Sequence, residues 1–280
     1  MEAPVAEGLV SGFIPGLTLF ILEKKIMLTL TGLDHIPLIQ PGDDLPGILA
    51  SALAHNRIEL LNGDILVIAQ KIVSKAEGRL VSLSEVSPSQ LACDLAKKVE
   101  KDPRFVELVL SESNRVMRTR PGTLIVEHHL GFVCANAGID HSNVKGSYGD
   151  PEEWYLLLPK DPDKSAQIIR EKLEAASGSH LGVMIIDSHG RAWRMGVVGT
   201  TIGFAGMPGL VDMRGEPDLF GYQLRITEIA AADELAGAAS LIMGQAAENI
   251  PAVHVRGFPY PLREGGLHEL IRPKDKDLFQ

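Results

Sequence analysis

The sequence predicts an α+β fold built from mixed sheets and packed helices. Short apolar runs of buried-strand length recur along the chain, and amphipathic stretches lie between some of them. These elements do not follow the regular strand–helix–strand repeat of a doubly wound parallel sheet. The glycine-rich sequences G-x-x-x-x-G-K-[ST] and G-x-G-x-x-G are also missing. We therefore expect an unusual topology that is neither a P-loop nor a Rossmann fold.

The first half of the chain is expected to contain two strands and three helices. The strands are 27–32 and 65–69, and the helices are 44–55, 89–99 and 103–114. Asp43 or Asp44 can cap the first helix, and Pro103 suits the first turn of the third. The tight turn Asn62-Gly63-Asp64 leads into the second strand. The polar segment 70–79, with its two lysines, suits a loop or the start of a helix.

The second half is expected to contain further strands and two helices. The strands are 123–126, 131–134, 183–186, 197–204 and 251–257, and the helices are 162–176 and 228–243. The second of these helices is alanine-rich and amphipathic. Glycines recur around the 197–204 run, where they indicate close packing or a bend and not a phosphate loop.

Composition limits the classes of partner. At 280 residues, the chain can form one large domain or two closely packed ones. The net charge of −9 argues against nucleic acid, which requires an extended basic surface. A small phosphorylated ligand remains compatible, because a few cations and a metal ion can act locally. The two cysteines, Cys93 and Cys134, lie far apart without a C-x-x-C motif, which indicates a reduced, cytoplasmic protein.

Residues 1–26 are interpreted as an N-terminal extension of a catalytic unit that spans 27–280. The apolar run Gly8–Leu22 is interrupted by glycine and proline and is short for a membrane span. Lysines follow this run instead of preceding it, unlike in a secretory signal. We expect either a mis-called start or an accessory segment, and no membrane partner.

Two short segments, 136–144 and 186–191, carry the strongest functional signal. Each places a carboxylate, Asp140 or Asp187, among small turn-forming residues just after an apolar run. Brought together at strand ends, these carboxylates would hold Mg²⁺ or Mn²⁺ against phosphate oxygens, and the Ser188 hydroxyl would add a third oxygen. The alternative is that both aspartates only stabilise turns or cap helices, as most loop aspartates do.

The lysine-bearing segment adds a possible phosphate contact. Lys75 can neutralise phosphate as a mobile charge, and Arg79 can grip an anion with two hydrogen bonds. A solvated cationic turn would have the same composition. Asn143 suits either a nucleotide contact or the turn itself. His141 and His189 stand beside oxygen donors, where an isolated histidine is usually not a ligand, so both are left outside the predicted metal site.

Taken in order, these segments resemble the coenzyme F420-0:γ-L-glutamate ligase family. The matching sequences are Gly63-Asp64, Ser74-Lys75-Ala76-Glu77-Gly78-Arg79, Asn136-Ala137-Gly138-Ile139-Asp140, Ser142-Asn143-Val144, Asp187-Ser188, Asp218-Leu219-Phe220-Gly221 and Pro251-Ala252-Val253. Each piece alone is common, but their combination over about residues 27–257 is specific.

The resemblance implies a GTP-dependent amide ligase that uses Mg²⁺ or Mn²⁺, with K⁺ as a further possible cation. Such enzymes add L-glutamate to the phospholactate carboxylate of a deazaflavin and then extend a γ-linked glutamate tail through an acyl phosphate. The family is known as a homodimer with an unusual α+β fold. The resemblance therefore implies GTP, glutamate and the deazaflavin as ligands and a second copy of the chain as partner.

The resemblance also implies roles for particular residues. Its metal-binding positions fall on Asp140, Asp187 and Ser188, where threonine is more familiar. Its nucleotide-contacting positions are Ile36, Pro37, Leu38, Ile39, Gln70, Lys71, Lys75 and Asn143. From the chemistry of phosphoryl transfer, we expect Lys75 and the two aspartates to be the catalytic residues, with the aspartates holding the metals and Lys75 the phosphates.

Two departures from the family pattern concern the substrate side. Tyr222 stands where an arginine is expected, and Ala246–Asn249 replaces a glycine-richer stretch. One alternative function is a deazaflavin- or flavin-binding oxidoreductase or carrier without ligase activity. Another is a non-catalytic nucleotide-binding partner, although the retained acidic pair argues against it.

Overall fold

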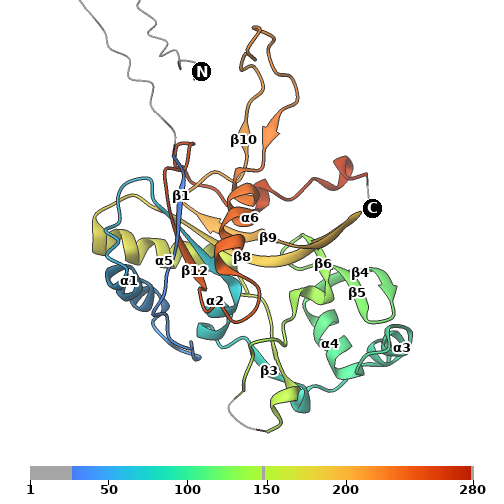
Figure 1. Cartoon of the computed structure of the whole chain (residues 1–280). Helices are drawn as coiled ribbons and strands as arrows, with labels where there is room; N and C mark the ends of the chain where they lie inside the picture. The colour runs from blue at the N-terminus through green and yellow to red at the C-terminus, as the bar shows by residue number, and fades with distance from the viewer. Residues whose placement is uncertain (1–26, 147–148, 279–280) are drawn as a thin grey trace, which may run out of the picture.

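A sheet of five strands forms the centre of this computed structural model, which describes residues 27–146 and 149–278. The strand order is β1-β12-β2-β8-β9 (Figure 1). The bounds are β1 Thr29–Gly32, β2 Ile65–Ala69, β8 Gly182–Arg191, β9 Arg194–Ala205 and β12 Ala252–Arg256. Strands β2 and β8 run parallel, and the other neighbouring pairs are antiparallel. The predicted extension, residues 1–26, lies outside the described residues.

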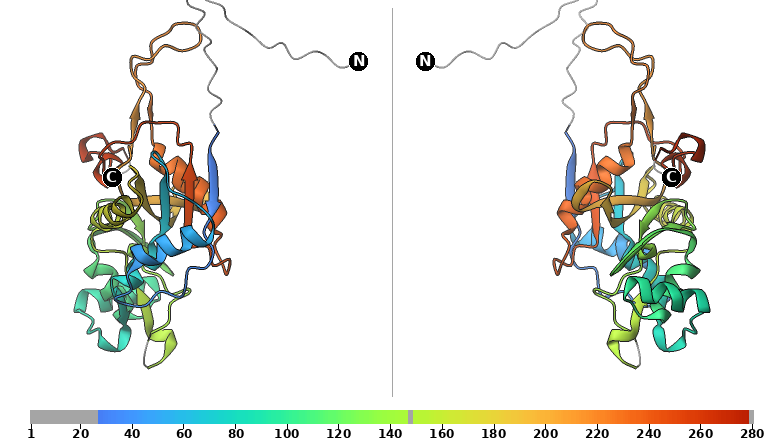
Figure 2. Two further views of the ribbon diagram at one scale, coloured as in Figure 1. Left: turned by 90° about the vertical axis from the view of Figure 1, so that its left-hand side faces the viewer. Right: turned by 90° about the vertical axis from the view of Figure 1, so that its right-hand side faces the viewer.

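Helices cover both faces of this sheet (Figures 1 and 2). The helix bounds are α1 Leu45–His55, α2 Gln70–Ala76, α3 Gln90–Val99, α4 Pro103–Ser111, α5 Pro162–Ser177 and α6 Ala231–Met243. Helices α1 and α5 pack on one face and α6 on the other. The mixed sheet with its packed helices confirms the predicted α+β class.

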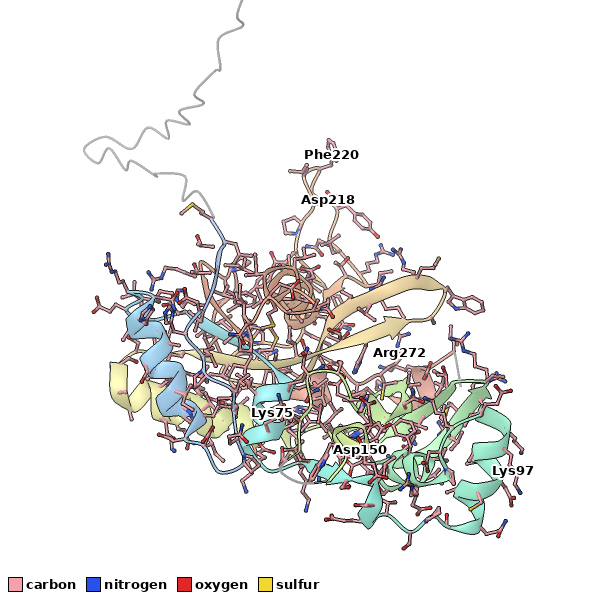
Figure 3. The ribbon with its side chains drawn as sticks, turned by 60° about the horizontal axis from the view of Figure 1, so that its bottom comes forward. Lys75, Lys97, Asp150, Asp218, Phe220 and Arg272 are labelled. Carbon is pink, nitrogen blue, oxygen red and sulfur yellow. The ribbon has the colours of Figure 1, made fainter. Side chains whose placement is uncertain are left out.

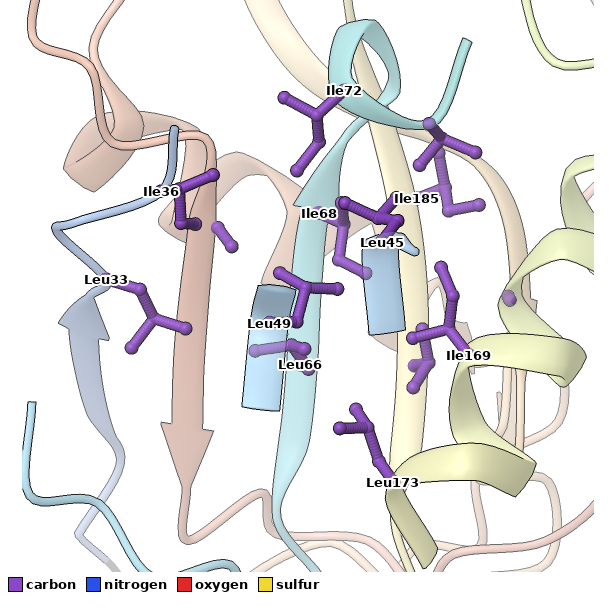
Figure 4. Packing of buried hydrophobic residues seen from close by; sticks show 14 of the residues in the cluster. Leu33, Ile36, Leu45, Leu49, Leu66, Ile68, Ile72, Ile169, Leu173 and Ile185 are labelled. Atoms are coloured by element: carbon purple, nitrogen blue, oxygen red, sulfur yellow. The ribbon is translucent and has the colours of Figure 1, made fainter. Parts of the chain in front are cut away.

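Side chains that point alternately to the two faces of the central sheet form two separate cores. Leu66 and Ile68 of β2 face α1 and α5, where Leu49 and Ile169 pack against them (Figure 4). The intervening β2 residues, Ile65 and Val67, face α6 on the other side of the sheet. Because successive side chains of a strand point to opposite faces, a continuous apolar run is what a strand buried on both faces requires.

A second sheet carries a third core beside the first two. It consists of β4 Ser113–Arg120, β5 Thr123–His128 and β6 Val133–Ala135, in that order. Leu124 and Val126 pack against α3 and α4. The opposite face of the same strand carries Ile125 and Glu127, which point into the cavity described below.

Two short strand pairs complete the fold. Strand β3 Leu80–Ser82 pairs with β7 Trp154–Leu156, and β10 Val211–Asp212 pairs with β11 Glu228–Ile229. The segment 211–229, called the arm below, projects from the body of the molecule (Figure 1). Short 3-10 turns occur at Leu83–Glu85, Asn136–Gly138, Pro151–Glu153, Leu267–Glu269 and Lys274–Lys276. Within the described ranges, every helix is too short or too polar to span a membrane.

The structure corrects several predicted boundaries. The segment 186–191 is not a turn, because β8 continues through it to Arg191 in a long hairpin with β9. Helix α4 ends at Ser111 because Ser113 already pairs with β5. Residues 228–229 belong to β11, so α6 begins at Ala231. In each case, pairing with a neighbouring strand of the chain overrides the local preference.

Candidate functional site

One large cavity of about 1830 Å³ brings the predicted site residues together. It opens between α2, the β8–β9 hairpin, the β4–β5–β6 sheet and the chain around 244–251. The predicted residues that line it are Pro37, Leu38, Ile39, Gln70, Lys71, Lys75, Asp140, Asn143, Asp187 and Ser188. Ile36 does not line it, because its side chain is buried in the core beside α1 (Figure 4).

Asp140 is held in place by its backbone and by α2. Its backbone forms an isolated antiparallel bridge with Leu156. Gln70 Nε2 donates a 2.6 Å hydrogen bond to Asp140 Oδ2, and Lys71 Nζ lies 3.3 Å from Oδ1. Gln70 is itself fixed by a hydrogen bond from Ser74. The first turn of α2, which directly follows β2, therefore positions the Asp140 carboxylate.

Asp140 and Asp187 line the same cavity, and the charge of Asp187 affects the pKa of Asp140. Burial and, to a smaller extent, the negative charge of Asp187 raise the pKa of Asp140 from 3.8 to about 6, against the opposing effect of Lys71. Two carboxylates in a partly dry cavity disfavour each other's charge, and a cation between them would relieve this repulsion.

The lysines of α2 contact the loop that carries Ser142 and Asn143. Lys71 Nζ donates to Ser142 Oγ at 3.0 Å, and Lys75 Nζ donates to the Asn143 carbonyl oxygen at 2.8 Å. Asn143 Nδ2 in turn donates to the Ala246 carbonyl oxygen at 3.2 Å. Burial lowers the pKa of Lys75, as does the neighbouring charge of Lys71. Both lysines line the cavity, where Lys71 also lies beside Asp140 and where Lys75 is labelled in Figure 3.

Asp187 and Ser188 lie on opposite faces of β8, as successive strand residues must. Asp187 Oδ2 lies 3.1 Å from His189 Nε2, on the face that also holds Phe132. The Ser188 hydroxyl donates to Gln245 Oε1 at 2.9 Å. A one-residue bulge in β9 opposite Ile185 and Ile186 precedes this point and re-aims the strand. Ser188 therefore contributes an oxygen to the α6 side of the cavity and not beside Asp187.

Gln245 is a cavity residue that the sequence did not indicate. It follows α6, and its Nε2 donates to Ser240 Oγ at 3.1 Å. This bond leaves Gln245 Oε1 directed toward Ser188. A glutamine in a loop carries no sequence signal, so only its hydrogen-bond partners show that it belongs to the site.

The two family departures fall in different places. Ala246–Asn249 lines the cavity beside Gln245, so that departure concerns the site itself. Tyr222 lies in the arm, where the Arg225 guanidinium stacks over its ring at 5.7 Å.

Three exposed side chains away from this cavity also have metal-binding character. Asp34, His35 and His55 bring ligand atoms within 4.8 Å of one another, and the two imidazole rings stack at 3.5 Å. Across the described ranges, Asp140 and Asp187 do not form such a group with a third His, Cys, Asp or Glu. A cation between the aspartates would therefore need further oxygens from water or from phosphate groups.

Comparison with known proteins shows the family of the chain. The family profile described as F420-0:Gamma-glutamyl ligase matches residues 34–257. The chain is 47% identical over 255 residues to the coenzyme F420:L-glutamate ligase of Methanothermobacter thermautotrophicus, covering 90% of this chain and 99% of that protein. The protein of the same name from Methanocaldococcus jannaschii is 41% identical over 260 residues, covering 92% and 99% of the two chains. That of Methanopyrus kandleri is 44% identical over 255 residues, covering 89% and 97%. The chain therefore belongs to the F420-0:gamma-glutamyl ligase family.

Proposed function

We propose that this protein is a GTP-dependent ligase that joins L-glutamate to the carboxylate of coenzyme F420-0 and extends a γ-linked glutamate tail. One observation carries the proposal: Asp140 and Asp187 meet in one cavity beside Lys71 and Lys75. The names of the relatives, coenzyme F420:L-glutamate ligase, supply the acceptor and the amino acid.

The residues present fit Mg²⁺ or Mn²⁺. Asp140 and Asp187 offer hard carboxylate oxygens that repel each other in the absence of a cation. Ser188 and Gln245 offer a second pair of oxygens on the other side of β8. When bound, the metal would neutralise phosphate charge during phosphoryl transfer. K⁺ is a further candidate that the same oxygen-rich wall suits.

The chemistry assigned to the chain is mostly positioning and charge neutralisation. A carboxylate oxygen of the acceptor attacks the γ-phosphorus of GTP, the bridging P–O bond breaks, and GDP leaves. The glutamate amine then attacks the acyl carbon, phosphate leaves, and the amine proton passes to solvent. Lys71 and Lys75 would bind the phosphates, with Asn143 and the cavity-lining Pro37, Leu38 and Ile39 around the rest of the nucleotide. Gln70 keeps Asp140 oriented through its 2.6 Å hydrogen bond.

The decisive experiment compares wild type with Asp187→Asn and a matched control. The protein is incubated with GTP, Mn²⁺, L-glutamate and coenzyme F420-0, and both released phosphate and product mass are measured. Wild type should give a ladder that rises by one glutamate at a time. Asp187→Asn should lose at least about a hundredfold in turnover while remaining folded.

The control is Asp94→Asn, which removes an exposed carboxylate from α3. It should retain wild-type turnover. Near-normal turnover of Asp187→Asn would refute the site assignment. Binding of the deazaflavin without any phosphate release by wild type would favour the alternative, a deazaflavin-binding oxidoreductase or carrier.

The quaternary structure proposed for the enzyme is a homodimer. Support comes from the arm, where Leu219, Phe220 and Ile226 are 98%, 95% and 88% exposed. Large apolar side chains grouped on a projecting segment suit a surface that is covered by another chain. A second copy is the partner that the family resemblance implies.

A further inference from the structure

The cavity reverses the charge balance of the molecule. Among its described lining residues are eight Lys or Arg side chains and five Asp or Glu side chains, whereas the whole chain has a net charge of −9. Two of the cations, Lys71 and Lys75, belong to the nucleotide side. The others are Arg115, Arg118, Lys145, Arg191, Arg272 and Lys274. A concentration of cations inside an acidic protein indicates an anionic ligand beyond the nucleotide.

The cavity is also larger than one ligand requires. Small-molecule sites usually occupy roughly 300–1000 Å³, whereas this cavity has about 1830 Å³. The part remote from α2 is bounded by the inner face of the β4–β5–β6 sheet and by the C-terminal segment 270–277. We call this part the sheet end of the cavity.

The sheet end combines apolar surface with arginines. Ile125, Val133 and Ala135 occupy neighbouring positions on β5 and β6 and face the cavity. Arg118 lines the same space from β4, where it is paired in register with Ile125. Arg272 lines it from the C-terminal segment.

The one acid of this sheet face is already neutralised. Glu127 Oε2 accepts a 2.6 Å hydrogen bond from Arg115 Nε, and Lys274 Nζ lies 3.3 Å from Glu127 Oε1. Arg115 and Lys274 are thus partly occupied by Glu127, whereas Arg118 and Arg272 add positive charge beyond this pairing. Among the described lining residues of the sheet end, the four cations Arg115, Arg118, Arg272 and Lys274 outnumber the two acids, Glu127 and Asp277, so its net field attracts anions.

The sheet end adjoins the acidic pair. Phe132, which precedes β6, lies with its ring centroid 5.2 Å from that of His189. His189 Nε2 lies 3.1 Å from Asp187 Oδ2. A ligand whose reacting end is beside Asp187 can therefore extend across Phe132 onto the sheet face.

We propose that the sheet end binds the acceptor behind its reacting carboxylate, with Arg118 and Arg272 contacting its phosphodiester and the carboxylates of its glutamate tail. This inference rests on the proposed ligase function and deepens it. The acceptor class is an aromatic ring system joined to a polyanionic tail, and the sheet end offers apolar surface and arginine forks to these two parts. Each added glutamate brings one more α-carboxylate, so these arginines act on tail extension more than on GTP.

The test measures binding without catalysis. Coenzyme F420-0 and its monoglutamyl and diglutamyl forms are titrated against full-length protein without GTP, and binding is followed by the deazaflavin fluorescence. The variant is Arg118→Gln combined with Arg272→Gln. We expect its Kd to rise at least about tenfold, and more for the diglutamyl form, because charge-assisted hydrogen bonds are lost.

Two measurements separate this inference from the function itself. The matched control, Lys97→Gln, removes one exposed cation from α3, at the outer edge of the molecule in Figure 3, whereas Arg272 lies toward its centre. Lys97→Gln should bind the acceptor with the wild-type Kd. The KM for GTP should stay within about twofold of wild type in both Lys97→Gln and the double arginine variant. An unchanged Kd in the double variant, or no acceptor binding by wild type, would overturn the inference. Acceptor binding lost in the variant, together with no ligase activity in wild type, would support the subsite and refute the proposed function.

Discussion

At the residue scale, the chemistry of the site was partly readable from the sequence. Asp140 and Asp187 were indicated by their carboxylates in similar contexts, and the structure places both in one cavity. The partners that define their geometry were not readable. Gln245, 57 positions from Ser188, meets it only because α6 packs against the hairpin. Such contacts depend on the tertiary fold, which leaves no local pattern.

Asp64 is a buried residue that links β2 to β12, a role that its predicted place in a turn did not indicate. The sequence placed it in a turn, but it is 1% exposed and anchors the far end of the central sheet. Its Oδ2 accepts hydrogen bonds from His254 Nε2 at 2.8 Å and Arg256 Nη2 at 2.7 Å. Burial would raise the pKa of Asp64, but the hydrogen bonds from Arg256 and His254 outweigh it and hold that pKa below 3.8.

The first prediction is that Asp64→Asn destabilises the fold by about 3 kcal/mol at neutral pH. Breaking a buried ion pair usually costs about 3–5 kcal/mol. We expect the lower value here, because Arg256 is half-exposed and water can solvate it when Asp64 is neutral. Because the folded-state pKa is depressed, this stability is present above the unfolded pKa of 3.8 and is lost as pH falls through the folded pKa.

Urea unfolding at pH 7 and at pH 3 measures this prediction. The difference in the free energy of unfolding between wild type and variant should be about 3 kcal/mol at pH 7 and should become smaller at pH 3. Asp94→Asn, at an exposed site, should change stability by less than about 0.5 kcal/mol. A gap that widens on acidification would show that the ionised carboxylate is not the stabilising group.

At the element scale, strongly periodic helices were predicted well and strand ends poorly. Helices α3 and α5 begin within one residue of the predicted starts, because Ser89 and Pro162 mark their first turns. The continuation of β8 through Ser188 and Gly190 was missed, because serine and glycine favour turns locally. Its pairing with β9, which ends in the exposed tip at Trp193, supplies the hydrogen bonds that overcome this preference.

The glycines of β9 are explained by helix packing. A Cβ at Gly199 would lie 2.4 Å from the Ala236 carbonyl oxygen of α6. A Cβ at Gly203 would lie 2.6 Å from the Pro162 carbonyl carbon at the start of α5. The expectation of close packing at these positions is confirmed, and the contacts are with helices on both faces of the sheet.

The second prediction uses this packing. Gly199→Ala should destabilise the protein by about 1–3 kcal/mol, because the added methyl group meets backbone that cannot move without shifting α6. Gly237→Ala, within α6 itself, should stabilise by about 0.5–1 kcal/mol, because its Cβ would meet only Val198 at 3.5 Å and alanine favours the helix. Thermal unfolding of both variants measures the difference. Equal effects would show that α6 is not packed on β9 as described.

At the scale of the whole molecule, the sequence predicted the class of fold but not how its parts enclose the site. The cavity walls come from segments as distant as Pro37 and Asp277. The separation into a central sheet and the β4–β5–β6 sheet also escaped prediction, because both contain apolar runs of similar length. Which strand pairs with which is decided by long-range packing, and a single sequence gives little information about it.

The last prediction concerns the arm and the proposed homodimer. Phe220→Asp should convert a dimer into monomers, because a twofold interface contains the substituted residue twice. Each buried phenylalanine contributes roughly 2–3 kcal/mol, so the dimer Kd should rise by at least about a thousandfold. Light scattering over a dilution series measures the molecular mass.

The matched control is Leu91→Asp, which places the same charge at a 60% exposed leucine of α3 and should leave the mass unchanged. A monomeric wild type, or a variant that stays dimeric at low concentration, would show that the arm does not hold two copies together. The exposed side chains of the arm would then need a different partner, since surface of this kind is rarely left uncovered.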